Sequence, residues 1–132
     1  MPLLSAFDSL PGRLDGSLLR AGDDGFDAAR RPWNLSIDQL PAAVAAPAGL
    51  DDLRLILAAA REAGTPLAVQ PSGHGASGDL SGAVIVRTAA FDRLEIDHDA
   101  GVVVVGSGVR WGAVVDALEG SGWAAPAGTS PV

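Results

Sequence analysis

A short apolar strand signal that runs straight into a glycine-rich loop constrains this chain more than any other stretch. Leu67 to Val69 is apolar, and the loop from Gln70 to Gly78 consists mostly of small residues around one histidine, His74. Glycine and serine let the backbone approach a ligand closely and leave N–H groups unhindered, as a bound phosphate requires. The stretch therefore predicts a strand ending at a site for a nucleotide-type cofactor, with His74 within reach of the ligand. The same loop also fits a tight connection without a ligand, in which His74 is simply exposed.

The segment before this loop predicts the longest helix of the chain, from Leu50 to Ala63. Asp51 and Asp52 fall in its first turn, where the helix dipole favours acidic side chains, and Gly64 ends it. Apolar residues recur at helical spacing and predict one buried stripe, made of Leu50, Leu53, Ile56, Leu57, Ala60 and Ala63.

Shorter signals surround that helix. Phe26 to Ala29 predicts a short helix that ends before Pro32, Ala42 to Ala46 a weak strand, and Ala83 to Arg87 a further strand. Residues 1–22 show no clear period. The order helix, strand, loop, strand predicts an α/β layer. It places the glycine loop at a strand end, where ligands of α/β sheets usually bind.

The pattern changes after Phe91. Residues 94–97 alternate with period two and residues 102–105 are all valine, so the intervening residues 98–101 predict the turn of a hairpin. Trp111, Val114, Val115 and Leu118 then mark a second amphipathic helix that ends near Gly120. The chain finishes in a second loop made mostly of small residues, from Trp123 to Val132.

Gly106 to Gly112 has the spacing of a dinucleotide-binding turn, because it follows a strand and opens a helix. The preceding strand belongs to a hairpin rather than to a βαβ unit, and no acidic residue follows at the place where one would hold a ribose. We therefore favour glycines that serve a sharp strand-to-helix turn, and keep a nicotinamide-binding domain as the weaker alternative.

Other chemistry-bearing residues have ordinary interpretations. His98 lies between two aspartates in the predicted hairpin turn, where neighbouring side chains alternate faces, so we predict a solvated residue and no metal site. Trp33, Trp111 and Trp123 are predicted to be core residues.

Composition excludes several classes of function. Net charge is −7 and the sequence pI is about 4.5, which argues against nucleic-acid partners and against docking on an anionic membrane. The chain has no Cys, which excludes disulfides, thiolate metal sites and a cysteine nucleophile. It has no Lys, which excludes Schiff-base and P-loop chemistry, and no Tyr. We see no signal peptide and no apolar run of membrane-spanning length, so we expect a cytoplasmic protein.

The order of these motifs resembles the front of the FAD-linked oxidoreductases of the berberine bridge enzyme-like group, with a flavin domain of the vanillyl-alcohol-oxidase (PCMH) type. The resemblance covers nearly all of residues 15–132. It rests on the helix end at 63–66, the strand and loop at 67–75, and the segments 26–34, 82–88, 91–97, 102–112 and 126–132. It implies an α+β fold, the first half of a PCMH-type domain with a small mixed sheet and flanking helices. A lead-in at residues 1–34 would precede an FAD-binding domain at 35–132 that stops short of the family's full domain.

The resemblance implies FAD as the cofactor and divides its contacts between two loops. The first loop would wrap the pyrophosphate with backbone N–H groups, and His74 matches the histidine that many members bond to the flavin 8α-methyl carbon. The second would lie beside the flavin rings, with Ser130 where doubly linked members carry a cysteine. The implied cofactor-binding residues are Gln70, Pro71, Ser72, Gly73, His74, Gly75, Ala76, Ser77, Gly78, Gly128, Thr129, Ser130, Pro131 and Val132.

The chain also departs from the family pattern. Many members carry Arg-Ser-Gly-Gly-His where this chain has Gln70-Pro-Ser-Gly-His74, and Pro71 removes one N–H donor. Family members are several times longer, so we expect a fragment or truncated gene product that binds cofactor without turning over alone. The implied reaction of the full enzyme is oxidation of an alcohol or similar small molecule by hydride transfer to flavin N5. The rival interpretation is a non-enzymatic binding module that kept this fold and lost flavin. Substrate, electron acceptor and oligomeric state stay open.

Overall fold

The structure is a computed structural model that describes residues 5–128. The chain forms two compact units, one up to Ala90 and one from Phe91 onward. Among the described residues, no helix has the length and apolar character needed to cross a membrane.

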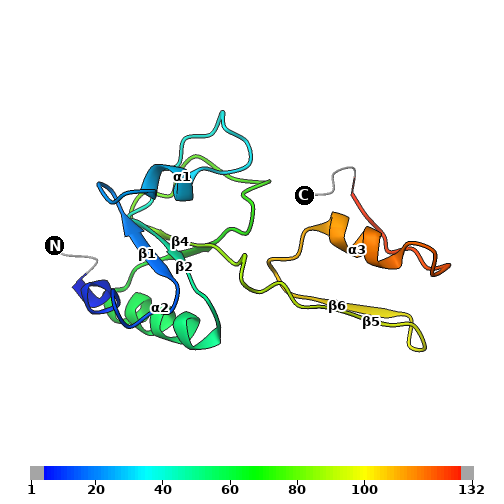
Figure 1. The fold of residues 1–132 in the computed structure, drawn as a ribbon. Helices are drawn as coiled ribbons and strands as arrows, with labels where there is room; N and C mark the ends of the chain where they lie inside the picture. Colours follow the sequence, from blue (N-terminus) through cyan, green and yellow to red (C-terminus); the bar gives the residue numbers. More distant parts are fainter. Residues whose placement is uncertain (1–4, 129–132) are drawn as a thin grey trace. The chain divides into compact units, whose positions relative to one another are not determined.

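A four-stranded mixed sheet forms the centre of the first unit (Figure 1). Its strands are β1 (Ser17–Arg20), β2 (Ala43–Ala46), β3 (Leu67–Val69) and β4 (Val84–Val86), in the spatial order β1-β2-β4-β3. β1 runs antiparallel to β2, whereas β2, β4 and β3 run parallel. The sequence did not predict strand β1, because residues 1–22 show no clear period; this strand extends the sheet beyond β2. The predicted small mixed sheet of an α+β domain is confirmed.

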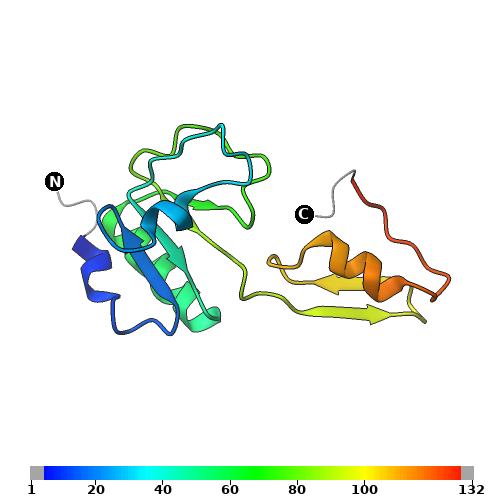
Figure 2. The ribbon, with the colours of Figure 1, turned by 45° about the horizontal axis from the view of Figure 1, so that its top comes forward.

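Helices cover both faces of this sheet (Figure 2). The helix α2 (Leu50–Ala63) and the 3-10 helix η1 (Ser5–Ser9) pack on one face, and the short helix α1 (Phe26–Arg30) packs on the other. Successive strand residues point to opposite faces, so the core divides into two clusters. The larger cluster contains Phe7, Leu10, Ala43, Ala45, Ile56, Ala59, Ala60, Val84 and Val86, and the smaller one contains Phe26, Val44 and Ile85.

The parallel register brings the site's two supporting strands to one edge of the sheet. Val69, the last residue of β3, pairs with Val86, the last residue of β4. Gln70 and Arg87 therefore emerge side by side, and the glycine loop begins at the carboxyl edge of the sheet, as predicted.

The second unit consists of the predicted hairpin and helix. β5 (Leu94–Asp97) pairs antiparallel with β6 (Val102–Val105), and α3 (Trp111–Leu118) follows. Gly106 lies between β6 and α3. Its N–H donates to the Arg93 carbonyl at 2.7 Å, and a Cβ on Gly106 would lie 2.0 Å from the Phe91 carbonyl oxygen. Close backbone packing therefore explains this glycine without a dinucleotide, and the antiparallel pairing confirms that the strand is not part of a βαβ unit.

Two predictions about burial are wrong. Leu50 and Leu57 are exposed, because the buried stripe of α2 is rotated toward Asp52, Ile56, Ala59 and Ala60. Trp33 and Trp123 are not core residues, since 56% and 51% of their surfaces are exposed; Trp111 is partly buried. Apolar character alone does not fix the buried face of a helix when small alanines pack closest to the sheet.

Asp52 joins the start of α2 to the entrance of β1. Its carboxylate is only 3% exposed and accepts hydrogen bonds from the backbone N–H groups of Ala48 at 2.8 Å, Gly16 at 2.8 Å and Asp15 at 3.0 Å. These bonds stabilise the ionised form, so the pKa of Asp52 is held below its ordinary value of 3.8, with the Ala48 N–H as the largest cause.

Replacing Asp52 by asparagine is expected to lower stability at neutral pH and to remove part of the acid sensitivity. The folded carboxyl binds a proton less readily than the unfolded one, so its contribution is present above pH 3.8 and is lost as the pH falls further. An asparagine NH₂ group would instead face a backbone donor. Urea unfolding from pH 7 down to pH 2 measures this, with the exposed Asp51→Asn as control. A parallel loss of stability with pH in Asp52→Asn and wild type would contradict the assignment.

Candidate functional site

A hollow of about 430 Å³ opens over the carboxyl end of β3, and we call it the loop hollow. It lies wholly within the first unit. The side chains of Gln39 and Leu80 border it together with the end of β3. The structure brings every residue of the predicted first loop to it: Gln70, Pro71, Ser72, Gly73, His74, Gly75, Ala76 and Ser77 line the hollow, and Gly78 follows directly.

The loop leaves most of its backbone donors available. Within residues 5–128, the loop amides that donate to a protein acceptor are those of Gln70, to the Val86 carbonyl at 3.0 Å, and Ala76, to the Gly73 carbonyl at 3.2 Å. The N–H groups of His74, Gly75 and Gly78 donate to no protein acceptor in that range. Unpaired backbone donors around a concave surface form the kind of site that binds phosphate oxygens.

The loop glycines divide into two kinds. Gly73 is required by the fold, because its φ is +74° and a Cβ there would lie 2.8 Å from Pro32 Cα. Gly75 and Gly78 have no such reason: their φ values lie outside the left-handed region, and a Cβ at either position would meet nothing within 4 Å. Glycine at these two positions leaves open space over the backbone, which fits the close approach of a ligand.

Trp33 packs beside His74 at the loop. The two ring centroids lie 5.2 Å apart with a tilt of 47°, and the backbone N–H of Trp33 donates to the Ser72 carbonyl at 2.9 Å. His74 is exposed, so its ring stays accessible to a ligand. The sequence analysis missed Trp33 as a site residue; its only signal was its place in the segment 26–34 that resembles the family.

Arg87 supplies a positive charge at the base of the loop. Its guanidinium donates to the carbonyls of Gln70 at 3.0 Å, Ala29 at 2.9 Å and Arg31 at 2.8 Å. Partial burial lowers the pKa of Arg87 below its ordinary value, and within residues 5–128 its guanidinium forms no ion pair with a carboxylate. Its charge is thus not neutralised by the protein and favours an anion at the loop.

Of the predicted second loop, Gly128 is exposed and belongs to the second unit, and Thr129, Ser130, Pro131 and Val132 lie outside the described residues. His98 is exposed in the hairpin turn, and the described residues contain no group of three or more side chains suited to hold a metal ion.

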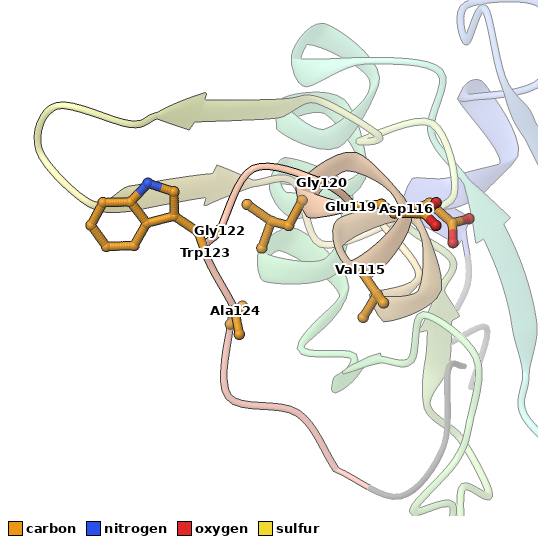
Figure 3. A pocket seen from close by; sticks show the side chains of 9 residues that line it. Val115, Asp116, Glu119, Gly120, Gly122, Trp123 and Ala124 are labelled. Atoms are coloured by element: carbon orange, nitrogen blue, oxygen red, sulfur yellow. The ribbon is translucent and has the colours of Figure 1, made fainter.

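A second hollow, of about 520 Å³, lies in the second unit between α3 and the segment that follows it (Figure 3). Figure 3 shows Val115 and Asp116 on α3 and Glu119 directly after its end, with Trp123 and Ala124 on the following segment. The two carboxylates of this second hollow, Asp116 and Glu119, would repel a pyrophosphate. The loop hollow is instead lined by backbone amides that have no acceptor among the described residues, and no carboxylate lines it. The loop hollow is therefore the better candidate for an anionic cofactor.

The loop hollow is a candidate site for the pyrophosphate of a dinucleotide cofactor, and the comparisons with known proteins identify the cofactor of the family. The model of the family described as FAD binding domain matches residues 41–131. The chain therefore belongs to this family of FAD-binding domains, and FAD is its cofactor.

Two curated relatives are also FAD-linked or FAD-dependent proteins. The uncharacterized FAD-linked oxidoreductase YvdP of Bacillus subtilis (strain 168) is 27% identical over 122 residues, which is 90% of this chain and 27% of YvdP. The FAD-dependent monooxygenase FUP4 of Fusarium proliferatum (strain ET1) is 30% identical over 99 residues, which is 72% of this chain and 19% of FUP4. The chain thus spans less than a third of the length of either relative.

Solved structures share the fold. Physcomitrella patens BBE-like 1 superposes with a TM-score of 0.80 at 23% identity, covering 94% of this chain and 28% of that one. The 6-hydroxy-D-nicotine oxidase of Arthrobacter nicotinovorans gives a TM-score of 0.76 at 25% identity, covering 89% of this chain and 26% of that one. The predicted resemblance to berberine bridge enzyme-like and vanillyl-alcohol-oxidase-type flavoenzymes is confirmed.

Proposed function

We propose that this chain provides the pyrophosphate-binding part of a flavin-dependent oxidoreductase, and that the loop 70–78 is the cofactor contact. The observation that carries the proposal is that, among the described residues, the amides of His74, Gly75 and Gly78 donate to no protein acceptor, and that His74 and Gly75 line the loop hollow. Arg87 donates to the Gln70 carbonyl where the loop begins, and no carboxylate of the described residues pairs with its charge. These features support binding of a diphosphate by backbone donors and electrostatic attraction.

The reaction proposed for the full-length family architecture is oxidation of an alcohol or similar C–H donor. FAD supplies the hydride-accepting chemistry when bound, and the residues described here bind and orient it. A small-molecule substrate, no nucleic-acid partner and a cytoplasmic location remain our predictions. The boundary between a lead-in at residues 1–34 and an FAD-binding domain at 35–132 also stays a prediction. Strand β1 lies in the lead-in and pairs with β2 of the domain in one sheet.

Titration of the purified protein with FAD, followed by flavin fluorescence and visible absorbance, tests cofactor binding. The proposal predicts saturation at one FAD per chain, and a melting temperature that rises with FAD but not with NADPH. Stabilisation by NADPH alone would favour the nicotinamide alternative at Gly106 to Gly112. Stabilisation by neither cofactor would favour a binding module that kept the fold and lost flavin.

We further propose that His74 carries a covalent bond to the flavin. His74 is exposed at the loop hollow and its ring packs beside Trp33, which supports a fixed position facing the cofactor. FAD-supplied protein is expected to keep its yellow colour in the acid precipitate, and His74→Ala is expected to lose it completely. The exposed hairpin residue serves as the control, so His98→Ala should retain the flavin. Flavin released from the wild-type precipitate, or retained in His74→Ala, would contradict the bond.

A further inference from the structure

Two buried carboxamides, those of Gln39 and Gln70, line the loop hollow, and the sequence pointed to Gln70 alone. Gln39 is 1% exposed and Gln70 is 9% exposed. The Gln39 Nε2 donates to Gln70 Oε1 at 3.1 Å, and the Gln70 Nε2 donates back to Gln39 Oε1 at 2.8 Å. Burial of two polar side chains is tolerated because each satisfies the other.

Gln39 also makes a third bond that reaches the far end of the loop. Its Nε2 donates to the Ser77 carbonyl at 2.6 Å. A carboxamide nitrogen carries two hydrogens, so Gln70 and Ser77 together use both. One side chain therefore joins the residue that begins the loop to a residue near its end, across a segment that contains His74 and Gly75.

The parts that hold Gln39 and Gln70 are themselves fixed. The Gln39 carbonyl accepts a hydrogen bond from the Arg30 guanidinium at 2.6 Å, and Arg30 also pairs with Asp27 and Asp38. Gln70 is bonded through its N–H to Val86 and through its carbonyl to Arg87. Gln39 thus transmits the position of the sheet edge to Ser77, whose carbonyl accepts from no other donor among the described residues.

We propose that Gln39 is a positioning residue for FAD binding: its carboxamide joins the two ends of the loop and pre-orders the free amides between them. This inference rests on the function proposed above. A loop already ordered in the free protein loses less conformational entropy when the ligand binds, so affinity is higher. Gln39 acts through Gln70 and Ser77 and needs no contact with the cofactor.

The test compares three variants of the full chain: Gln39→Leu, Gln70→Leu and the double variant. Each single change leaves one buried carboxamide without its partner and is expected to lower the melting temperature. The double change removes both carboxamides together and is expected to recover much of that stability. It still leaves the Ser77 carbonyl without its donor, so FAD affinity is expected to stay roughly 10-fold below wild type in Gln39→Leu and in the double variant.

Comparing the melting temperature with the Kd for FAD separates a positioning role of Gln39 from a merely structural one, because a structural role would let FAD affinity recover together with stability in the double variant. Asp52→Asn is the matched control, because Asp52 is a buried hydrogen-bonding group of the same unit outside the loop hollow; it should lower stability without changing the Kd for FAD. Amide hydrogen exchange in the absence of FAD adds an independent readout: in Gln39→Leu, faster exchange is expected at Ala76, whose N–H donates to the Gly73 carbonyl within the loop. Wild-type affinity in Gln39→Leu, or recovered affinity in the double variant, would overturn the inference while leaving the proposed function in place. Failure of wild-type protein to bind FAD would overturn both.

Discussion

Gly75→Val is expected to weaken FAD binding by at least about 100-fold without lowering the melting temperature. Gly75 has a φ outside the left-handed region, and a Cβ there meets no protein atom within 4 Å, so the fold has room for a larger side chain. A branched side chain at this position would occupy the space through which a phosphate approaches the amides of the loop. The effect should therefore appear in the Kd for FAD alone.

Gly49→Val is the matched control for that experiment. Gly49, like Gly75, has a φ outside the left-handed region and open space around its Cβ position, but it lies before α2 and outside the loop hollow. It should leave FAD affinity unchanged. Equal affinities for Gly75→Val and wild type would show that the cofactor does not approach the loop at this point.

Gly16→Ala is expected to destabilise the first unit by roughly 2–4 kcal/mol. A Cβ at Gly16 would lie 2.1 Å from the Ala46 carbonyl oxygen, 2.8 Å from the Ala48 nitrogen and 3.0 Å from Asp52 Oδ2. All three atoms belong to the contact that joins the entrance of β1 to β2 and α2. The backbone would have to separate there, which breaks the hydrogen bond from the Gly16 N–H to Asp52 and strains the β1–β2 pairing.

Urea unfolding followed by circular dichroism measures this change, with Gly49→Ala as the control that adds a methyl group to open space. The control should unfold within about 0.5 kcal/mol of wild type. A Gly16→Ala protein as stable as the control would mean that β1 does not enter the sheet as the structure describes.

The parts of the fold predicted from sequence are those with strong local signals. The helix 50–63 keeps a helical spacing of apolar residues along its whole length and ends at a glycine. The hairpin joins the alternating residues 94–97 to the valine run 102–105, and both elements appear within their predicted bounds. Strand β1 was missed because Ser17–Arg20 is a short run in which neither face is fully buried. Its position depends on Asp52 and Gly16, and no local pattern reveals bonds between residues 36 positions apart.

The site shows the same division between local and long-range information. The glycine loop was visible because a strand, small residues and one histidine are adjacent in sequence. Gln39 and Gln70 are 31 positions apart, and a single glutamine before a strand carries no signal for burial until the sheet brings it beneath the loop. Trp33 was assigned to the core from its residue type, whereas its ring packs beside His74 at the surface.

The most direct test of the central claim is a titration of ¹⁵N-labelled protein with FAD, followed amide by amide in two-dimensional NMR spectra. The claim that the loop binds the cofactor's pyrophosphate predicts that the amides of His74, Gly75 and Gly78 shift most, and that ADP, which shares the diphosphate, shifts the same resonances. The amides of the hairpin turn at residues 98–101 should stay in place and serve as the internal reference. Large shifts at Gly106 to Gly112 with an unchanged loop, or no shifts at saturating FAD, would contradict the assignment of the cofactor to residues 70–78.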